Sequence, residues 1–184
     1  DAVDAYLQQL KIAPKDERTL LHLGNSYYNL TRYDDALEAY RQIVKINDEN
    51  NEVWFKIGVT CDALERHNDA IGAWRQVLKI TPDDPYAWAN LAHSYMALTR
   101  NSDAIDAYLQ SITIKPDNIE VLFPLGLLYK ISKRYPESIN TWYQVLKYDP
   151  NNTSALLNLG LTYLDTGDTA STLDVVKRLR KIDP

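Results

Sequence analysis

Cysteine is nearly absent from this chain, since Cys61 is the only one among its 184 residues. A single thiol cannot form an internal disulfide, so a fold held together by disulfide bonds is excluded. The shortage of cysteine fits a reducing compartment, and we expect the protein to be cytoplasmic.

Long hydrophobic runs are absent as well. The uninterrupted apolar stretches are a few residues long, far short of the roughly 20 residues that a transmembrane helix needs. The opening sequence, DAVDAYLQQL, has neither the basic start nor the apolar centre of a secretory signal. We therefore expect no membrane span. The sequence does not begin with methionine, so removal of an export signal stays open as an alternative to a cytoplasmic protein.

Positive charge is not in excess either. The net charge is -5 and the isoelectric point is about 5.2. Proteins that bind nucleic acid depend on Lys and Arg contacts with phosphates, so this balance predicts no nucleic-acid partner.

What the sequence does contain is a repeat of 34 residues, marked by prolines. The prolines that lie on this spacing are Pro14, Pro82, Pro116, Pro150 and Pro184. Only Asp48 interrupts the series. Helices repeat every 3.6 residues and strands every 2, so a period of 34 must be the length of a supersecondary unit. Five complete units start at Glu17, Asn51, Pro85, Ile119 and Thr153.

Each unit contains two amphipathic helices. In the first, helix A, positions 4, 7, 8 and 11 follow the spacing of one helix face. Position 8 is always small: Gly24, Gly58, Ala92, Gly126 and Gly160. Position 11 is Tyr27, Cys61, Tyr95, Tyr129 and Tyr163. The second, helix B, has a core face at positions 20, 24, 27 and 30, and its position 24 is Tyr40, Trp74, Tyr108, Trp142 and Val176. We expect this large side chain to pack over the small residue of helix A.

Helix B has its own start signals. We expect it to begin after an acidic capping residue, for which the candidates are Asp34, Asp69 and Asp103. His67 is expected in the turn between the two helices. Since one helix pair cannot bury its apolar faces alone, neighbouring units must stack.

These positions resemble the tetratricopeptide repeat family. The third unit carries the pattern most fully, in Trp88, Leu91, Ala92, Tyr95, Ala104, Tyr108 and Pro116. The resemblance implies an all-α, right-handed superhelical solenoid of antiparallel helix pairs, with about 5.5 repeats and 11 helices. A single array would occupy 1–184, with helix B of a partial repeat at 1–16 and five repeats at 17–50, 51–84, 85–118, 119–152 and 153–184. We expect this to be a segment of a longer array, since the first unit lacks its helix A and no polar capping helix follows the last.

No motif of catalysis or metal binding is present. The sequence has no phosphate-binding glycine loop, no HExxH and no pair of cysteines. His22 and His93 lie two units apart, too far to share a metal ion. We expect no enzyme activity, no cofactor and no metal.

Binding is instead expected on the concave face. Helix A directs positions 2, 5, 6, 9, 12 and 13 toward a groove. The candidate groove residues are Asn25, Tyr28, Phe55, Lys56, Tyr86, Asn90, His93, Phe123, Leu127, Lys130, Leu157, Asn158 and Leu161. Amides hold a peptide backbone because they donate and accept at once. The C-terminal half carries an apolar stripe: Phe123, Leu127, Ile131, Leu157, Leu161 and Leu164. Such a stripe binds a partner or is covered by another segment of the same protein.

The resulting prediction is a non-catalytic scaffold for protein–protein interaction, holding a peptide or helix of a partner protein in the groove. One alternative is a substrate-recruiting segment of a larger enzyme, such as a protein glycosyltransferase. Another is self-association. The Lys and Asn positions required by the family's clamp for chaperone C-termini are not satisfied in any three consecutive units. An RNA-reading helical repeat is disfavoured by the period and the acidic charge.

Overall fold

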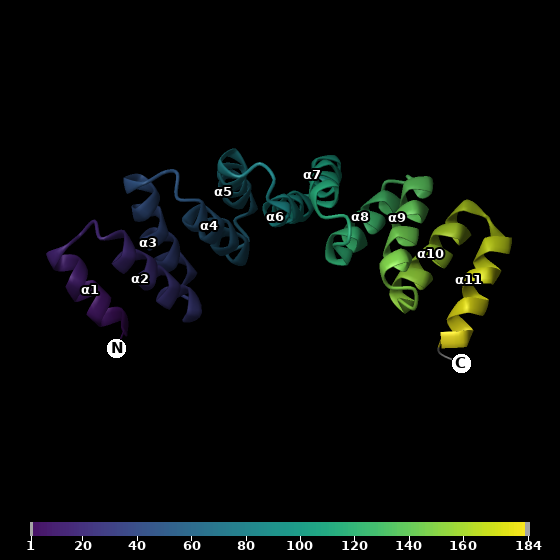
Figure 1. Ribbon diagram of the computed structural model, residues 1–184, viewed down its shortest axis with the longest axis horizontal. Coiled ribbons are helices and arrows are strands. Elements are labelled where there is room, and N and C mark those ends of the chain that lie inside the picture. Colours follow the sequence, from purple (N-terminus) through teal and green to yellow (C-terminus); the bar gives the residue numbers. More distant parts are fainter. Residues whose placement is uncertain (1, 183–184) are drawn as a thin grey trace. The chain divides into compact units, whose positions relative to one another are not determined.

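The computed structural model describes residues 2–182, which form eleven helices and no strand (Figure 1), so the all-α prediction is confirmed. The helices are α1 (Ala2–Ile12), α2 (Glu17–Asn29), α3 (Tyr33–Ile46), α4 (Asn51–Ala63), α5 (His67–Ile80), α6 (Pro85–Ala97), α7 (Asn101–Ile114), α8 (Ile119–Ile131), α9 (Tyr135–Tyr148), α10 (Thr153–Thr166) and α11 (Thr169–Ile182). The even-numbered helices begin at the first residues of the five repeats read from the sequence. Asp1 and Pro184, at the two ends of the expected array, lie outside the described residues. None of the described helices combines the length and the apolar character that crossing a membrane requires.

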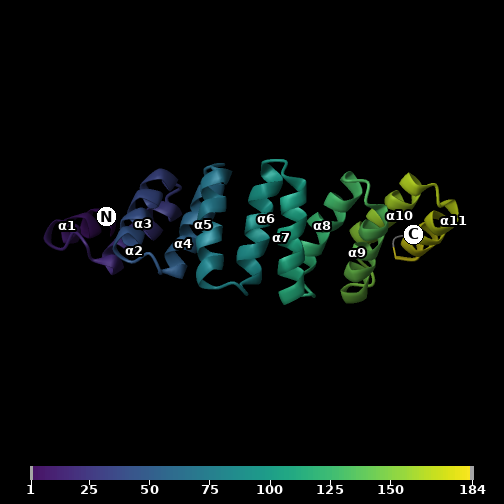
Figure 2. The same ribbon diagram turned by 90° about the horizontal axis from the view of Figure 1, so that it is seen from above.

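The chain divides into two compact units. The N-terminal unit contains α1 to α6 and the C-terminal unit contains α7 to α11. Within each unit, consecutive helices pack against each other, as Figure 2 shows for α4 and α5.

The helix ends are built by repeated local devices. Side chains of Asx type cap the first helix of four repeats by accepting from backbone N–H groups; they are Asp16, Asn50, Asp84 and Asn152. The turn after the first helix uses a residue in the left-handed conformation in all five repeats, at Thr31, Glu65, Thr99, Lys133 and Gly167.

The start of the second helix differs from the sequence prediction. Asp34 and Asp69 lie inside the first turns of α3 and α5, and the residue before each helix is an arginine. Arg66 forms an ion pair with Asp69. In other repeats the same arginine lies over the ring of the position-11 tyrosine, as Arg32 does over Tyr27. The acidic residues therefore hold an arginine and favour the helix dipole, and they do not act as caps.

In the first, second and fourth repeats the core contains an aromatic ring packed on a glycine. A Cβ atom added to Gly58 would lie 2.7 Å from the ring of Trp74, and one added to Gly126 would lie 2.8 Å from Trp142. Both tryptophans are fully buried. The close approach of the helices therefore requires glycine at these positions.

Two features of the core were missed in the sequence. The first helix of each repeat also buries position 3, such as Val53, and in the last four repeats it buries position 10, which includes Thr60 and Ser94. In the last repeat the prediction that Val176 lies in the core is wrong, because Val176 is 36% exposed and Val175 packs against Gly160 instead. Valine lacks the reach of a tryptophan ring, so α11 buries the neighbouring side chain.

Candidate functional site

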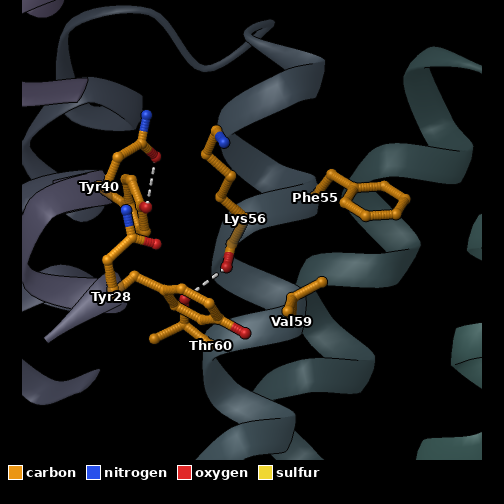
Figure 3. Close-up of a pocket in the computed structure, with 8 residues that line it drawn as sticks. Tyr28, Tyr40, Phe55, Lys56, Val59 and Thr60 are labelled. Atoms are coloured by element: carbon orange, nitrogen blue, oxygen red, sulfur yellow. Dashed lines mark hydrogen bonds between the residues drawn. The ribbon is translucent and has the colours of Figure 1, made fainter. Parts of the chain in front are cut away.

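A pocket of about 370 Å³ lies among α2, α3 and α4 in the N-terminal unit. We call it the N-terminal pocket, and its lining residues are Asn25, Tyr28, Asn29, Tyr40, Phe55, Lys56, Val59 and Thr60 (Figure 3). Four of the predicted groove residues, Asn25, Tyr28, Phe55 and Lys56, meet here. They come from two successive repeats, which explains why no single repeat shows the site.

The amide of Asn25 is held in one orientation. The Tyr40 hydroxyl donates a hydrogen bond of 2.8 Å to the Asn25 Oδ1 atom. Burial raises the pKa of Tyr40 to about 12, so this hydroxyl is a neutral donor at neutral pH. Because Oδ1 is occupied, the Nδ2 group of Asn25 is left to donate to a ligand.

Lys56 adds a positive charge to the pocket. Its Nζ atom lies 3.7 Å from Glu52, one helix turn away, and its side chain is 30% exposed. Its backbone carbonyl accepts from the Thr60 hydroxyl at 2.6 Å. The ammonium group can therefore turn toward a ligand without breaking a buried contact.

The apolar wall of the pocket is formed mainly by Tyr28 and Val59. In Figure 3 the ring of Phe55 is turned away from Tyr28. It packs edge-on against Trp74, with ring centroids 4.9 Å apart. Phe55 thus supports the structure at the margin of the pocket.

The other predicted residues of this unit do not line the pocket. Tyr86, Asn90 and His93 all lie on α6, and Tyr86 is 53% exposed. The backbone carbonyl of Asn90 accepts from Ser94. Of the seven predicted groove residues in the N-terminal unit, four therefore line the pocket, and the three on α6 do not.

Asp62 is an important residue that sequence reasoning did not select. Its carboxylate accepts from the Trp74 indole at 3.0 Å and from the Ser94 hydroxyl at 2.8 Å. His67 Nδ1 lies 3.1 Å from the same carboxylate. His67 is the first residue of α5, so its expected place in the turn is corrected. Asp62 thereby joins α4, α5 and α6, and the signal for it was a tryptophan at position 24 with an aspartate at position 12.

His93 gives the N-terminal unit a pH dependence. Although part of its side chain is exposed, burial lowers the pKa of its imidazole below 6.5, and Asp62 opposes this only in part. The unfolded chain therefore binds a proton near pH 6.5 while the folded chain does not, so stability must fall as the pH drops through this value. We expect the melting temperature of H93Q to fall less than that of the wild type between about pH 7.5 and 5.5. Equal losses in thermal scans of the two proteins would contradict this assignment.

In the C-terminal unit, exposed aliphatic side chains gather on α8 and α10. We call them the leucine surface, formed by Leu127, Ile131, Leu157, Leu161 and Leu164, which are between 38% and 69% exposed. Predicted groove residues Leu127, Leu157 and Leu161 belong to it. The surface is apolar, as the sequence indicated.

The remaining predicted residues of this unit are engaged within it. Phe123 is half-buried and packs edge-on against Trp142 at 5.2 Å between ring centroids. Lys130 forms an ion pair of 3.4 Å with Asp165 on α10. Asn158 donates to the carbonyl of Ser154 in its own helix. These side chains shape the margin of the leucine surface and present few free polar groups.

Among residues 2–182 no three His, Cys, Asp or Glu side chains are grouped as a metal site. Burial raises the pKa of the Cys61 thiol to about 11. A thiol with this pKa is protonated at neutral pH and is a poor nucleophile.

Comparison with known proteins identifies the repeat and the fold. The sequence pattern described as Tetratricopeptide repeat matches residues 21–85 and 62–119, and the pattern described as TPR repeat matches residues 128–167. A search among curated proteins finds no match to the sequence.

Solved structures match almost the whole chain. A crystal structure of MamA has a TM-score of 0.84 at 20% identity, covering 91% of this chain and 91% of that one. YrrB, described as a TPR protein with an unusual peptide-binding site, has a TM-score of 0.81 at 15% identity, covering 99% and 94%. MamA from Desulfovibrio magneticus RS-1, from residue 41 to its end, has a TM-score of 0.79 at 14% identity, covering 91% and 94%. At these identities the likeness concerns the fold alone.

Proposed function

Because the chain belongs to the tetratricopeptide repeat family, we propose that it is a non-catalytic scaffold that binds an extended segment of a partner protein in the N-terminal pocket. The observation that carries this proposal is the fixed amide of Asn25 beside the ammonium group of Lys56. Both groups donate hydrogen bonds, and the wall next to them is apolar.

The complementary ligand has an acceptor oxygen adjacent to an apolar side chain. An extended peptide meets this requirement, since it offers a backbone carbonyl at every residue and side chains on alternate sides. The Asn25 amide would donate to a backbone carbonyl, and Lys56 would hold a second carbonyl or an acidic side chain. A pocket of about 370 Å³ has the size of sites that accept small ligands or single large side chains.

The named relatives support the class of function in one respect. YrrB is described as having a peptide-binding site, so a repeat array with this fold can carry one. The specific residues proposed here rest on the geometry of this chain.

Peptides selected from a random library by the whole chain test the proposal. We expect Y28A and K56Q each to lower the affinity for the selected peptides about tenfold, because each removes one contact group at the centre of the site. The measurement is fluorescence anisotropy with labelled peptides. The matched control is R18Q, which removes a positive charge from α2 outside the pocket. If Y28A and K56Q bind the peptides as well as R18Q does, the pocket is not the site.

A further inference from the structure

Tyrosines at position 11 make a repeated contact with the helix before them. In the N-terminal unit, Arg75 on α5 donates to the Tyr95 hydroxyl on α6 at 2.9 Å. In the C-terminal unit, the hydroxyl groups of Tyr143 on α9 and Tyr163 on α10 lie 3.0 Å apart. In both cases a polar side chain at position 25 meets the tyrosine hydroxyl of the next repeat.

The junction of α3, α4 and α5 lacks this tyrosine. Cys61 occupies the position, and Arg41 is the counterpart of Arg75. With no tyrosine hydroxyl to bind, the Arg41 guanidinium lies 3.6 Å from Asp69. A pocket of about 370 Å³, which we call the Cys61 pocket, is found here and is lined by Arg41, Val44, Trp54, Ile57, Cys61, Asn68, Asp69, Gly72, Ala73 and Gln76.

The equivalent place in the C-terminal unit contains the tyrosine. The pocket among α9, α10 and α11 is lined by Tyr163 and Tyr143 and measures about 190 Å³. The Cys61 pocket is therefore about twice as large where the aromatic ring is missing. Its floor is the buried Cys61 side chain, and its wall is the Trp54 ring, whose indole N–H is fixed by a 2.6 Å bond to the Asp48 carbonyl.

Gly72 is a second, independent sign that this pocket is kept open. It lies in the middle of α5, where glycine weakens a helix relative to any other residue except proline. A Cβ atom at Gly72 would meet nothing within 4 Å, so packing does not require glycine here. The same position in the other repeats is Glu38, Asp106, Asn140 and Asp174. The missing side chain leaves the mouth of the pocket clear.

We propose that the Cys61 pocket receives a tyrosine side chain of a partner protein. The ring would lie against Trp54 above Cys61, in the volume that the chain's own tyrosine fills at other junctions. The hydroxyl would accept from Arg41, as the Tyr95 hydroxyl accepts from Arg75. This site is separate from the N-terminal pocket, because Trp54, Ile57 and Cys61 lie on the face of α4 opposite Phe55, Lys56 and Val59.

N-acetyl-L-tyrosinamide titrated into the isotope-labelled chain tests the proposal by NMR. We expect a dissociation constant on the order of 1 mM, as befits a ligand of this size, with shifts at residues of α3, α4 and α5. N-acetyl-L-phenylalaninamide should bind at least about threefold more weakly, because it lacks the hydroxyl that Arg41 binds. Failure of the wild-type chain to bind the tyrosine derivative would overturn the assignment.

Variants at two positions locate the binding. G72Q covers the mouth from an exposed helix position, whereas the matched control G72A adds only a methyl group and leaves the mouth open. C61Y fills the pocket with the chain's own ring. We expect G72Q and C61Y to lose binding at least about tenfold while G72A and K56Q retain it. Equal binding of the tyrosine derivative by G72Q and G72A would overturn the proposal, even if C61Y did not fold. Loss of binding in K56Q alone would also overturn it, because the tyrosine derivative would then bind in the N-terminal pocket.

Discussion

Replacing Gly58 by alanine is expected to lower the free energy of unfolding of the N-terminal unit by about 2–3 kcal/mol. The new methyl group would lie 2.7 Å from the Trp74 ring, closer than van der Waals contact allows. The ring cannot move away freely, because it is fully buried and its indole N–H is bonded to Asp62. Helices α4 and α5 must therefore separate, and their shared core loosens.

The same substitution at Gly72 is the matched control. Gly72 lies in α5, and a methyl group there enters open space. G72A should therefore raise the free energy of unfolding by up to about 1 kcal/mol through helix propensity alone. Urea titrations followed by circular dichroism at 222 nm distinguish the two variants. If G58A and G72A changed the free energy of unfolding by the same amount, the contact with Trp74 would not be the reason that Gly58 must be glycine.

The repeat period predicted the first helix of each repeat accurately, for a physical reason. Residues of helix A must contact their own helix B and the adjacent repeat at once, so glycine, tyrosine and aliphatic side chains recur at fixed positions. These constraints place the start of α4 at Asn51 and of α8 at Ile119, as the structure shows. The second helix has a weaker signal, since its start depends on an arginine that serves as a surface partner of an acidic residue.

The candidate site was only partly predictable. Periodicity identifies the face on which a side chain lies, and it placed Asn25, Tyr28 and Lys56 on one face of helix A, where they line the same pocket. It cannot tell which polar groups already have partners inside the chain. Asn158 shares its repeat position with Lys56 and Asn90, yet its amide donates to the Ser154 carbonyl of its own helix.

Cavities were still harder to foresee. Cys61 is visible in the sequence as a small residue in place of tyrosine, but whether neighbours collapse into the missing volume depends on their rigidity. In the structure Trp54 is fixed by the Asp48 carbonyl and Arg41 is drawn to Asp69, so the space persists. Cys61 in α4 and Gly72 in α5 are both smaller than the residues at the same positions of the other repeats, and both line the Cys61 pocket.

Loss of the Asp62 carboxylate is expected to destabilise the N-terminal unit by about 2–3 kcal/mol. The variant D62A would leave the buried Trp74 indole N–H without its acceptor and would also release Ser94 and His67. An unsatisfied buried donor costs about 1–3 kcal/mol, and bonds to a charged acceptor are stronger than bonds to a neutral one. The side chain of Asp62 is 28% exposed, which keeps the expected loss below that of a fully buried carboxylate.

A double-mutant cycle separates this hydrogen bond from general packing. W74F removes the indole N–H, so D62A should cost at least about 1 kcal/mol less in the W74F background than in the wild type. The matched single variant is K130A, which changes the equivalent position of the fourth repeat. There the Trp142 indole N–H has no hydrogen-bond partner among residues 2–182, so no such bond is lost. We expect K130A to cost less than about 1 kcal/mol, since its ion pair with Asp165 is partly exposed. If D62A were as mild as K130A in urea titrations, the Asp62 network would not hold α4, α5 and α6 together.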